Sequence, residues 1–147
     1  MRKTILSWIL GSLIGTFAMD MVMFGEFYLY RLPLSANYAV IGSVVGRGVL
    51  IGLTLHALMG LFLGIVLGLL VAKVDALKID SPSKSFGLGL AAGIVTIPFG
   101  CVPVAIITGT PVWEFLKFSI IPHLAWGTIM GVVASFGLHG EPRNRLS

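Results

Sequence analysis

Four long apolar stretches, separated by short polar segments, dominate the chain. They cover about 4–29, 49–74, 86–107 and 113–138. A helix rises about 1.5 Å per residue, so about 20 apolar residues cross the ~30 Å hydrocarbon core of a bilayer. Each stretch is long enough to do so. The pattern therefore predicts an all-α fold, with residues 1–147 forming one polytopic domain, a four-transmembrane-helix bundle.

The segments between these stretches carry turn residues and charges. Residues 31–48 form a connector, which we interpret as an interfacial or re-entrant segment containing a short helix. The third stretch is expected to begin with Ser83 or Ser85 as its N-cap. Pro98 and Pro103 lie inside it, where proline deletes a helical hydrogen bond and clashes with the preceding turn. A kink or break is predicted there.

Composition supports the membrane interpretation. Only 11% of residues are charged and the mean hydropathy is +1.00, whereas soluble domains carry about 25% charged residues. A signal peptide is the alternative for the first stretch, but the apolar run continues well past Ala18. The single cysteine, Cys101, excludes an intrachain disulfide and a CxxC motif. No basic run is long enough to suggest a nucleic-acid partner.

The distribution of basic residues predicts the orientation. Most fall on the side of the membrane that holds both termini: Arg2, Lys3, Lys73, Lys78, Lys84, Arg143 and Arg145. Fewer fall on the other side: Arg31, Arg47 and Lys117. Because positive charge accumulates in the cytoplasm, both termini are predicted to be cytoplasmic, with the protein in the cell membrane. Trp8 and Trp113 lie near predicted span ends, where an aromatic belt is expected.

The second and fourth stretches share the pattern His-x-x-x-Gly-x-x-x-Gly, starting at His56 and His123. The first and third share a looser glycine pattern. The chain therefore reads as two tandem helical hairpins, related by an axis along the membrane normal. Small residues let membrane helices approach closely. The glycines predicted to pack helices are Gly11, Gly15, Gly52, Gly60, Gly64, Gly89, Gly93, Gly127 and Gly131.

With this topology, one polar side chain from each helix falls in the outer half of the membrane, about 9–13 Å deep. The four residues are Asp20, His56, Cys101 and His123. Ionisable residues inside a membrane are expensive and are functional candidates by default.

Three interpretations of this layer remain open. His56 and His123, flanked by small residues, would suit axial ligation of a haem b iron. Asp20, His56, His123 and Cys101 would suit a transition metal, or the first three a proton site. Alternatively, Asp20 hydrogen-bonds one histidine and only ties helices together, which contributes about 0.6 kcal/mol per pair.

Conventional enzyme signatures are absent from the sequence: there is no G-x-S-x-G, Walker loop, H-E-x-x-H or dinucleotide fingerprint. Together with glycine-rich faces and little extramembrane mass, this favours a non-catalytic protein. We expect an accessory or structural subunit of a membrane complex or homo-oligomer. Its partners would be the lipid bilayer and other membrane subunits or copies of itself.

Three segments resemble known families: Gly15-Thr-Phe-Ala-Met-Asp20, Leu55-His56-Ala-Leu-Met-Gly60 and Pro122-His123-Leu-Ala-Trp-Gly127. The chain is similar there to uncharacterised prokaryotic four-helix membrane families. These have a glycine- and alanine-rich first helix ending in Met-Asp, and His-x-x-x-Gly on helices two and four. The resemblance implies a four-helix fold and singles out Asp20, His56 and His123. It implies no activity.

Overall fold

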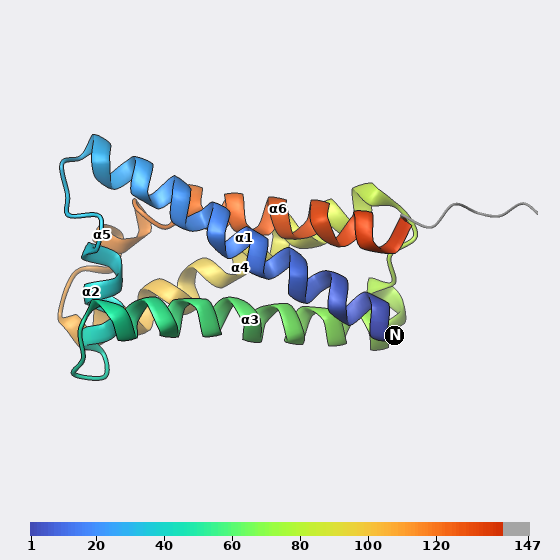
Figure 1. Ribbon diagram of the computed structural model, residues 1–147, viewed down its shortest axis with the longest axis horizontal. Coiled ribbons are helices and arrows are strands. Elements are labelled where there is room, and N and C mark those ends of the chain that lie inside the picture. The colour runs from blue at the N-terminus through green and yellow to red at the C-terminus, as the bar shows by residue number, and fades with distance from the viewer. Residues whose placement is uncertain (140–147) are drawn as a thin grey trace, which may run out of the picture.

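The computed structural model describes residues 1–139, which are helical with no strand among them (Figure 1). The elements are α1 (Arg2–Leu29), α2 (Ala36–Ser43), α3 (Val49–Lys73), the short 3-10 helix η1 (Asp75–Leu77), α4 (Pro82–Thr108), α5 (Val112–Leu116) and α6 (Ile120–His139). Helices α1, α3, α4 and α6 are long and apolar enough to cross a membrane. The predicted all-α fold with four membrane-crossing helices is confirmed to that extent.

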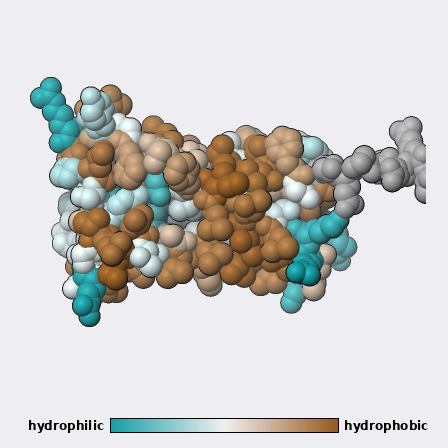
Figure 2. All heavy atoms as spheres, in the orientation of Figure 1, coloured by the Kyte–Doolittle hydropathy of each residue, from teal (hydrophilic) through white to brown (hydrophobic). Residues whose placement is uncertain are grey.

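The four long helices form an elongated bundle. Helices α1 and α4 run in one direction, and α3 and α6 run in the other (Figure 1). The start of α1 and the end of α6 lie at the same end, while α2 and α5 lie at the opposite end. Helix α1 packs against α3 and α6, and α6 also packs against α4. Apolar side chains cover the middle of the visible face, with hydrophilic residues towards its two ends (Figure 2).

Glycines bring these helices into close contact. At each of the glycines predicted from the sequence, an added Cβ would come within 3.0 Å of an atom of a neighbouring element. Serine hydroxyls cross two of the contacts: Ser12 Oγ donates to the Gly60 carbonyl at 2.6 Å, and Ser85 Oγ donates to the Gly131 carbonyl at 2.8 Å. Backbone proximity of this kind is how helices associate without a hydrophobic driving force between them.

The fourth predicted span is not one helix. The chain forms α5, turns through residues 117–119 and begins α6 at Ile120. Pro122 favours the division, because in a continuous helix its ring would clash with the carbonyl four residues earlier, that of Phe118, although α4 accommodates two internal prolines. Pro122 instead lies in the first turn of α6, where a backbone N–H would have no partner within the helix, so the N–H that proline lacks is not needed.

The third span also differs from expectation. Helix α4 begins at Pro82, with Ser81 as its N-cap; the Ser81 hydroxyl accepts from the Lys84 N–H at 3.4 Å. The prediction of Ser83 or Ser85 as the cap was therefore wrong, because Pro82 suits the first helical position and makes the preceding Ser81 the cap. The helix continues through Pro98 and Pro103 without interruption.

Trp8 was wrongly assigned to an interfacial belt. It is fully buried, in a core with Val71, Trp126 and Met130. The indole fits because the facing positions on α3 include Gly68, whose added Cβ would lie 3.3 Å from the Trp8 Cβ. Trp113, by contrast, is 62% exposed. Position near a span end therefore does not by itself predict the environment of a tryptophan.

Candidate functional site

The packed face of α1 leads directly to the first polar pair. Ser12, Thr16 and Asp20 are four residues apart and so lie on one side of the helix. Ser12 and Thr16 meet α3 at Gly60. His56 precedes Gly60 by one turn, which brings it to Asp20: His56 Nδ1 lies 3.2 Å from Asp20 Oδ1, with the side chains only 13% and 14% exposed.

Tyr38 of α2 completes this cluster. Gly52 lets the Tyr38 backbone lie directly against α3, and the Tyr38 and His56 ring centroids are 5.9 Å apart. Burial, and then the nearby Asp20 carboxylate, raises the pKa of the Tyr38 phenol well above its usual range, so the hydroxyl keeps its proton. Among residues 1–139, Asp20 Oδ1, His56 Nδ1 and Tyr38 OH find no aligned hydrogen-bond partner, although they are close together.

The second histidine has different neighbours. His123 Nδ1 lies 2.7 Å from the Ser119 carbonyl oxygen, one turn earlier. The Cys101 thiol of α4 donates to Ser119 Oγ at 3.1 Å, and Ser119 Oγ donates to the Phe115 carbonyl at 2.7 Å. Cys101 is buried and therefore faces the bundle. Gly100 leaves room beside the ring, because a Cβ there would stand 3.6 Å from His123 Nε2.

These contacts fix where each imidazole carries its proton. A carbonyl oxygen only accepts hydrogen bonds, so at 2.7 Å His123 Nδ1 must be the donor. At His56, an unprotonated Nδ1 would oppose a carboxylate oxygen at 3.2 Å, lone pair against lone pair, so the proton belongs on Nδ1 there too. Each neutral ring then presents an unprotonated Nε2, a hydrogen-bond acceptor and metal ligand.

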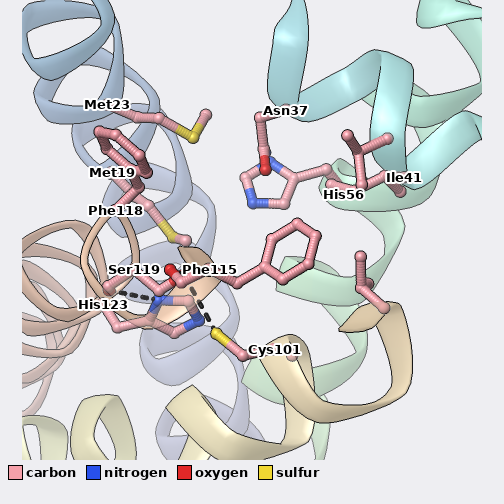
Figure 3. A pocket seen from close by; sticks show the side chains of 13 residues that line it. Met19, Met23, Asn37, Ile41, His56, Cys101, Phe115, Phe118, Ser119 and His123 are labelled. Carbon is pink, nitrogen blue, oxygen red and sulfur yellow. Dashed lines mark hydrogen bonds between the residues drawn. The ribbon is translucent and has the colours of Figure 1, made fainter. Parts of the chain in front are cut away.

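Both histidines line a shared cavity of about 100 Å³. Figure 3 shows the two rings on opposite sides of it, with Cys101 and Ser119 beside His123 and Asn37 beside His56. A smaller cavity of about 70 Å³ also touches both histidines, together with Met19, Thr96 and Trp126. The two rings therefore stand between a chamber facing α2 and α5 and one facing the middle of the bundle.

The four residues predicted as metal ligands do not form one cluster but lie in two separate pairs. Asp20 pairs with His56, while Cys101 and His123 are joined through Ser119. Among the residues that the structure describes, no group of three or more His, Cys, Asp and Glu side chains is placed to hold a metal ion. The 100 Å³ cavity corresponds to a few water molecules at about 30 Å³ each. Taken alone, it is smaller than the ~300–1,000 Å³ of drug-sized pockets.

Sequence reasoning did not find Tyr38, Gly100 or Ser119 as parts of the site. Ser119 carried a signal, since it lies one turn before His123 and the first turn of a helix offers a carbonyl to such a ring. Tyr38 carried none, because its approach depends on how α2 folds back onto α3. None of the protein-family models, curated proteins and solved structures compared with the chain matches it.

Proposed function

We propose that this chain is a non-catalytic integral membrane protein that binds and releases a proton at the Asp20–His56 pair. The observation that carries the proposal is the 3.2 Å approach of these two side chains, both largely buried between helices that can cross a membrane. Histidine is the side chain whose charge changes near neutral pH. Acidic and histidine side chains inside membranes commonly mark proton pathways.

The surroundings support proton binding better than covalent chemistry. The only thiol, Cys101, donates to the Ser119 hydroxyl rather than to an imidazole. His123 uses Nδ1 on a backbone carbonyl and so has no carboxylate to activate it within residues 1–139. A nucleophile paired with an oriented base, the arrangement that covalent catalysis needs, is not assembled in this part of the chain.

The orientation proposed with this function places both termini in the cytoplasm and treats the chain as two tandem hairpins, α1–α3 and α4–α6. Its support is that consecutive long helices pack together in each pair. The basic residues Arg2, Lys73 and Lys84 also gather at the end that holds the N-terminus. A reporter fused after Leu138 should behave as cytoplasmic, and one inserted near Asn37 as external. The opposite pair of results would reverse the orientation.

Assembly into a membrane complex or homo-oligomer remains part of the proposal. Its support is the small extramembrane mass and the extent of large apolar side chains on the outside of the bundle, which lipid or another helix must cover. Purification in mild detergent should yield the chain with partners or copies. A stable monomer alone would remove this part of the proposal and leave the proton site intact.

Infrared difference spectroscopy after a pH step tests the proton site directly. In lipid nanodiscs, the wild-type protein should show a change in the Asp20 carboxylate bands when the pair binds a proton on acidification, and this change should be absent in Asp20→Asn. Asp75→Asn is the matched control, because the Asp75 side chain is 87% exposed at the other end of the bundle. If Asp20→Asn and Asp75→Asn gave the same difference spectrum, the proposal would be refuted.

The haem interpretation has its own test, an absorption spectrum of protein from its native membrane. The small cavity leads us to expect no Soret band. A Soret band that is lost or shifted in both His56→Ala and His123→Ala would replace the proton proposal, since six-coordinate iron loses a ligand in each variant.

A further inference from the structure

The bundle is closed on three sides and open on the fourth. Contacts between α3 and α1, α1 and α6, and α6 and α4 seal three of the four neighbouring pairs. Within residues 1–139, α3 and α4 have no comparable interface. Helix α2 packs on α3 and reaches α4 at one end, and the segment containing η1 joins α3 to α4 at the other. The opening is thus a window in the side wall, where lipid would stand.

The 70 Å³ cavity lies behind this window. Its walls include Met59 and Leu63 on α3 and Thr96 on α4, and it reaches inward to His56 and His123. Met59 lines the cavity and is also 56% exposed on the outside, so it stands at the edge of the opening. The chamber that holds the two imidazoles is therefore reached from the apolar face of the molecule, between two helices that can cross a membrane.

The chamber has a definite hydrogen-bonding character. His123 Nδ1 bonds to the Ser119 carbonyl and His56 Nδ1 faces the Asp20 carboxylate at 3.2 Å, so the Nε2 of each neutral ring is left as an acceptor. A molecule held by either ring through Nε2 must donate a hydrogen bond, as a hydroxyl or amine does and as a carbonyl or phosphate diester does not. At about 30 Å³ per water-sized group, the cavity admits only a small head group.

We propose that the window between α3 and α4 admits a membrane-dissolved amphiphile, whose hydroxyl or amine head donates to His123 or His56 while its apolar tail stays among the lipids. The inference rests on the proposed function in one respect, the Nδ1 proton of His56 that Asp20 enforces. Geometry alone fixes the His123 acceptor and the window. The amphiphile would compete with a proton for the same nitrogens.

A pair of matched probes tests the head-group chemistry. Tritiated 4-nonylphenol donates one hydrogen bond, and 4-nonylanisole is its methyl ether and donates none. Binding to the full chain in nanodiscs is measured by scintillation proximity, with empty nanodiscs correcting for partition into lipid. We expect the phenol to bind about tenfold more tightly than the ether, the difference that a buried hydrogen bond makes. Equal binding of the two probes, or no binding of either, would overturn the proposal.

Variants then test the route. Met59→Trp places a bulky ring at the window, and Leu58→Trp does the same at an adjacent residue that is 53% exposed but does not line the cavity. We expect Met59→Trp to slow phenol association about tenfold and Leu58→Trp to leave it unchanged. Equal rates in the two variants would rule out entry through the window.

His123→Phe should remove the preference for the phenol over the ether while the variant still purifies as a folded bundle. If it does not fold, the comparison of Met59→Trp with Leu58→Trp still decides the route. These outcomes are separable from failure of the proton proposal. If the Asp20 band change is absent, the proton proposal fails, but the phenol should still be preferred through His123. If the band change is present and the two probes bind equally, only the amphiphile proposal fails.

Discussion

The two histidines share a sequence pattern but not a chemical setting. His56 faces a carboxylate from another helix, and a tyrosine from α2 stands beside it. His123 bonds to the backbone carbonyl of Ser119, one turn earlier in the sequence, and the Ser119 hydroxyl and the Cys101 thiol lie nearby. Both rings keep the proton on Nδ1, yet only His56 has a partner that can itself gain or lose charge.

That difference shows what a repeated motif determines. The glycines after each histidine determine helix packing, and both sets are used for it: Gly60 and Gly64 against α1, Gly127 and Gly131 against α4. The chemistry at the histidine depends on what the neighbouring helix presents one turn further along. Helix α1 presents Asp20, whereas α4 presents Gly93 to the His123 backbone and Cys101 nearby.

The largest difference between the halves should appear when a methyl group is added at the glycine one turn after each histidine. Gly127→Ala pushes Cβ into the backbone of Gly89 and Gly93, which cannot rotate away; Gly60→Ala meets the Thr16 side chain, which can. We expect losses of about 3 kcal/mol and about 1 kcal/mol in the free energy of unfolding. Titration with SDS in bicelles measures both, and equal losses would contradict the packing described for α4 and α6.

Alkaline pH should destabilise the protein through Tyr38, whose ring packs beside His56. The folded state raises the pKa of this phenol, so its contribution is complete below the unfolded value of about 10 and is lost as pH rises through the folded value. The loss is at most about 1.4 kcal/mol per pH unit. Tyr38→Phe should flatten the alkaline limb of a stability profile, whereas Tyr28→Phe, at a residue 78% exposed, should not. A profile unchanged by Tyr38→Phe would place the ring outside the core.

Removing the charge of Asp20 should have a moderate effect confined to one half. Asp20→Asn keeps the shape of the side chain and weakens its interaction with His56, at a cost of about 1 kcal/mol. Cys101→Ala removes a weaker donor, the thiol that bonds to Ser119 Oγ, and should cost less. Thermal denaturation in nanodiscs ranks the two variants, and a larger loss for Cys101→Ala would reverse the proposed asymmetry.

The smallest effects should be equal in the two halves. Ser12→Ala and Ser85→Ala each remove one hydroxyl bond to a carbonyl on the facing helix. Each should cost about 0.6 kcal/mol, the average for such bonds in membranes. The same SDS titration measures them, with Ser43→Ala as control, since Ser43 bonds only to its own helix. Unequal losses would show that the two crossings are not equivalent.

Apolar length and small-residue spacing predicted the four long helices and the glycine contacts, because both follow from local sequence and the thickness of a bilayer. The division at residues 117–119 was predictable in principle from Pro122. Which helix Asp20 faces was not, since the sequence offered two histidines at similar depth. The role of Tyr38 depends on α2 folding back onto α3, a tertiary event without local signature.

The central claim is that Asp20 and His56 form a protonatable pair while His123 stays a neutral acceptor. Nitrogen-15 NMR of histidine-labelled protein in nanodiscs tests it most directly, with His139→Gln leaving two rings to assign. At neutral pH both should carry the proton on Nδ1. When the pair binds a proton, the His56 Nε2 signal should move to the protonated position, and Asp20→Asn should alter the His56 signals while leaving those of His123 in place. A His56 signal that Asp20→Asn leaves unchanged, or a proton on Nε2 of both rings at neutral pH, would contradict the account.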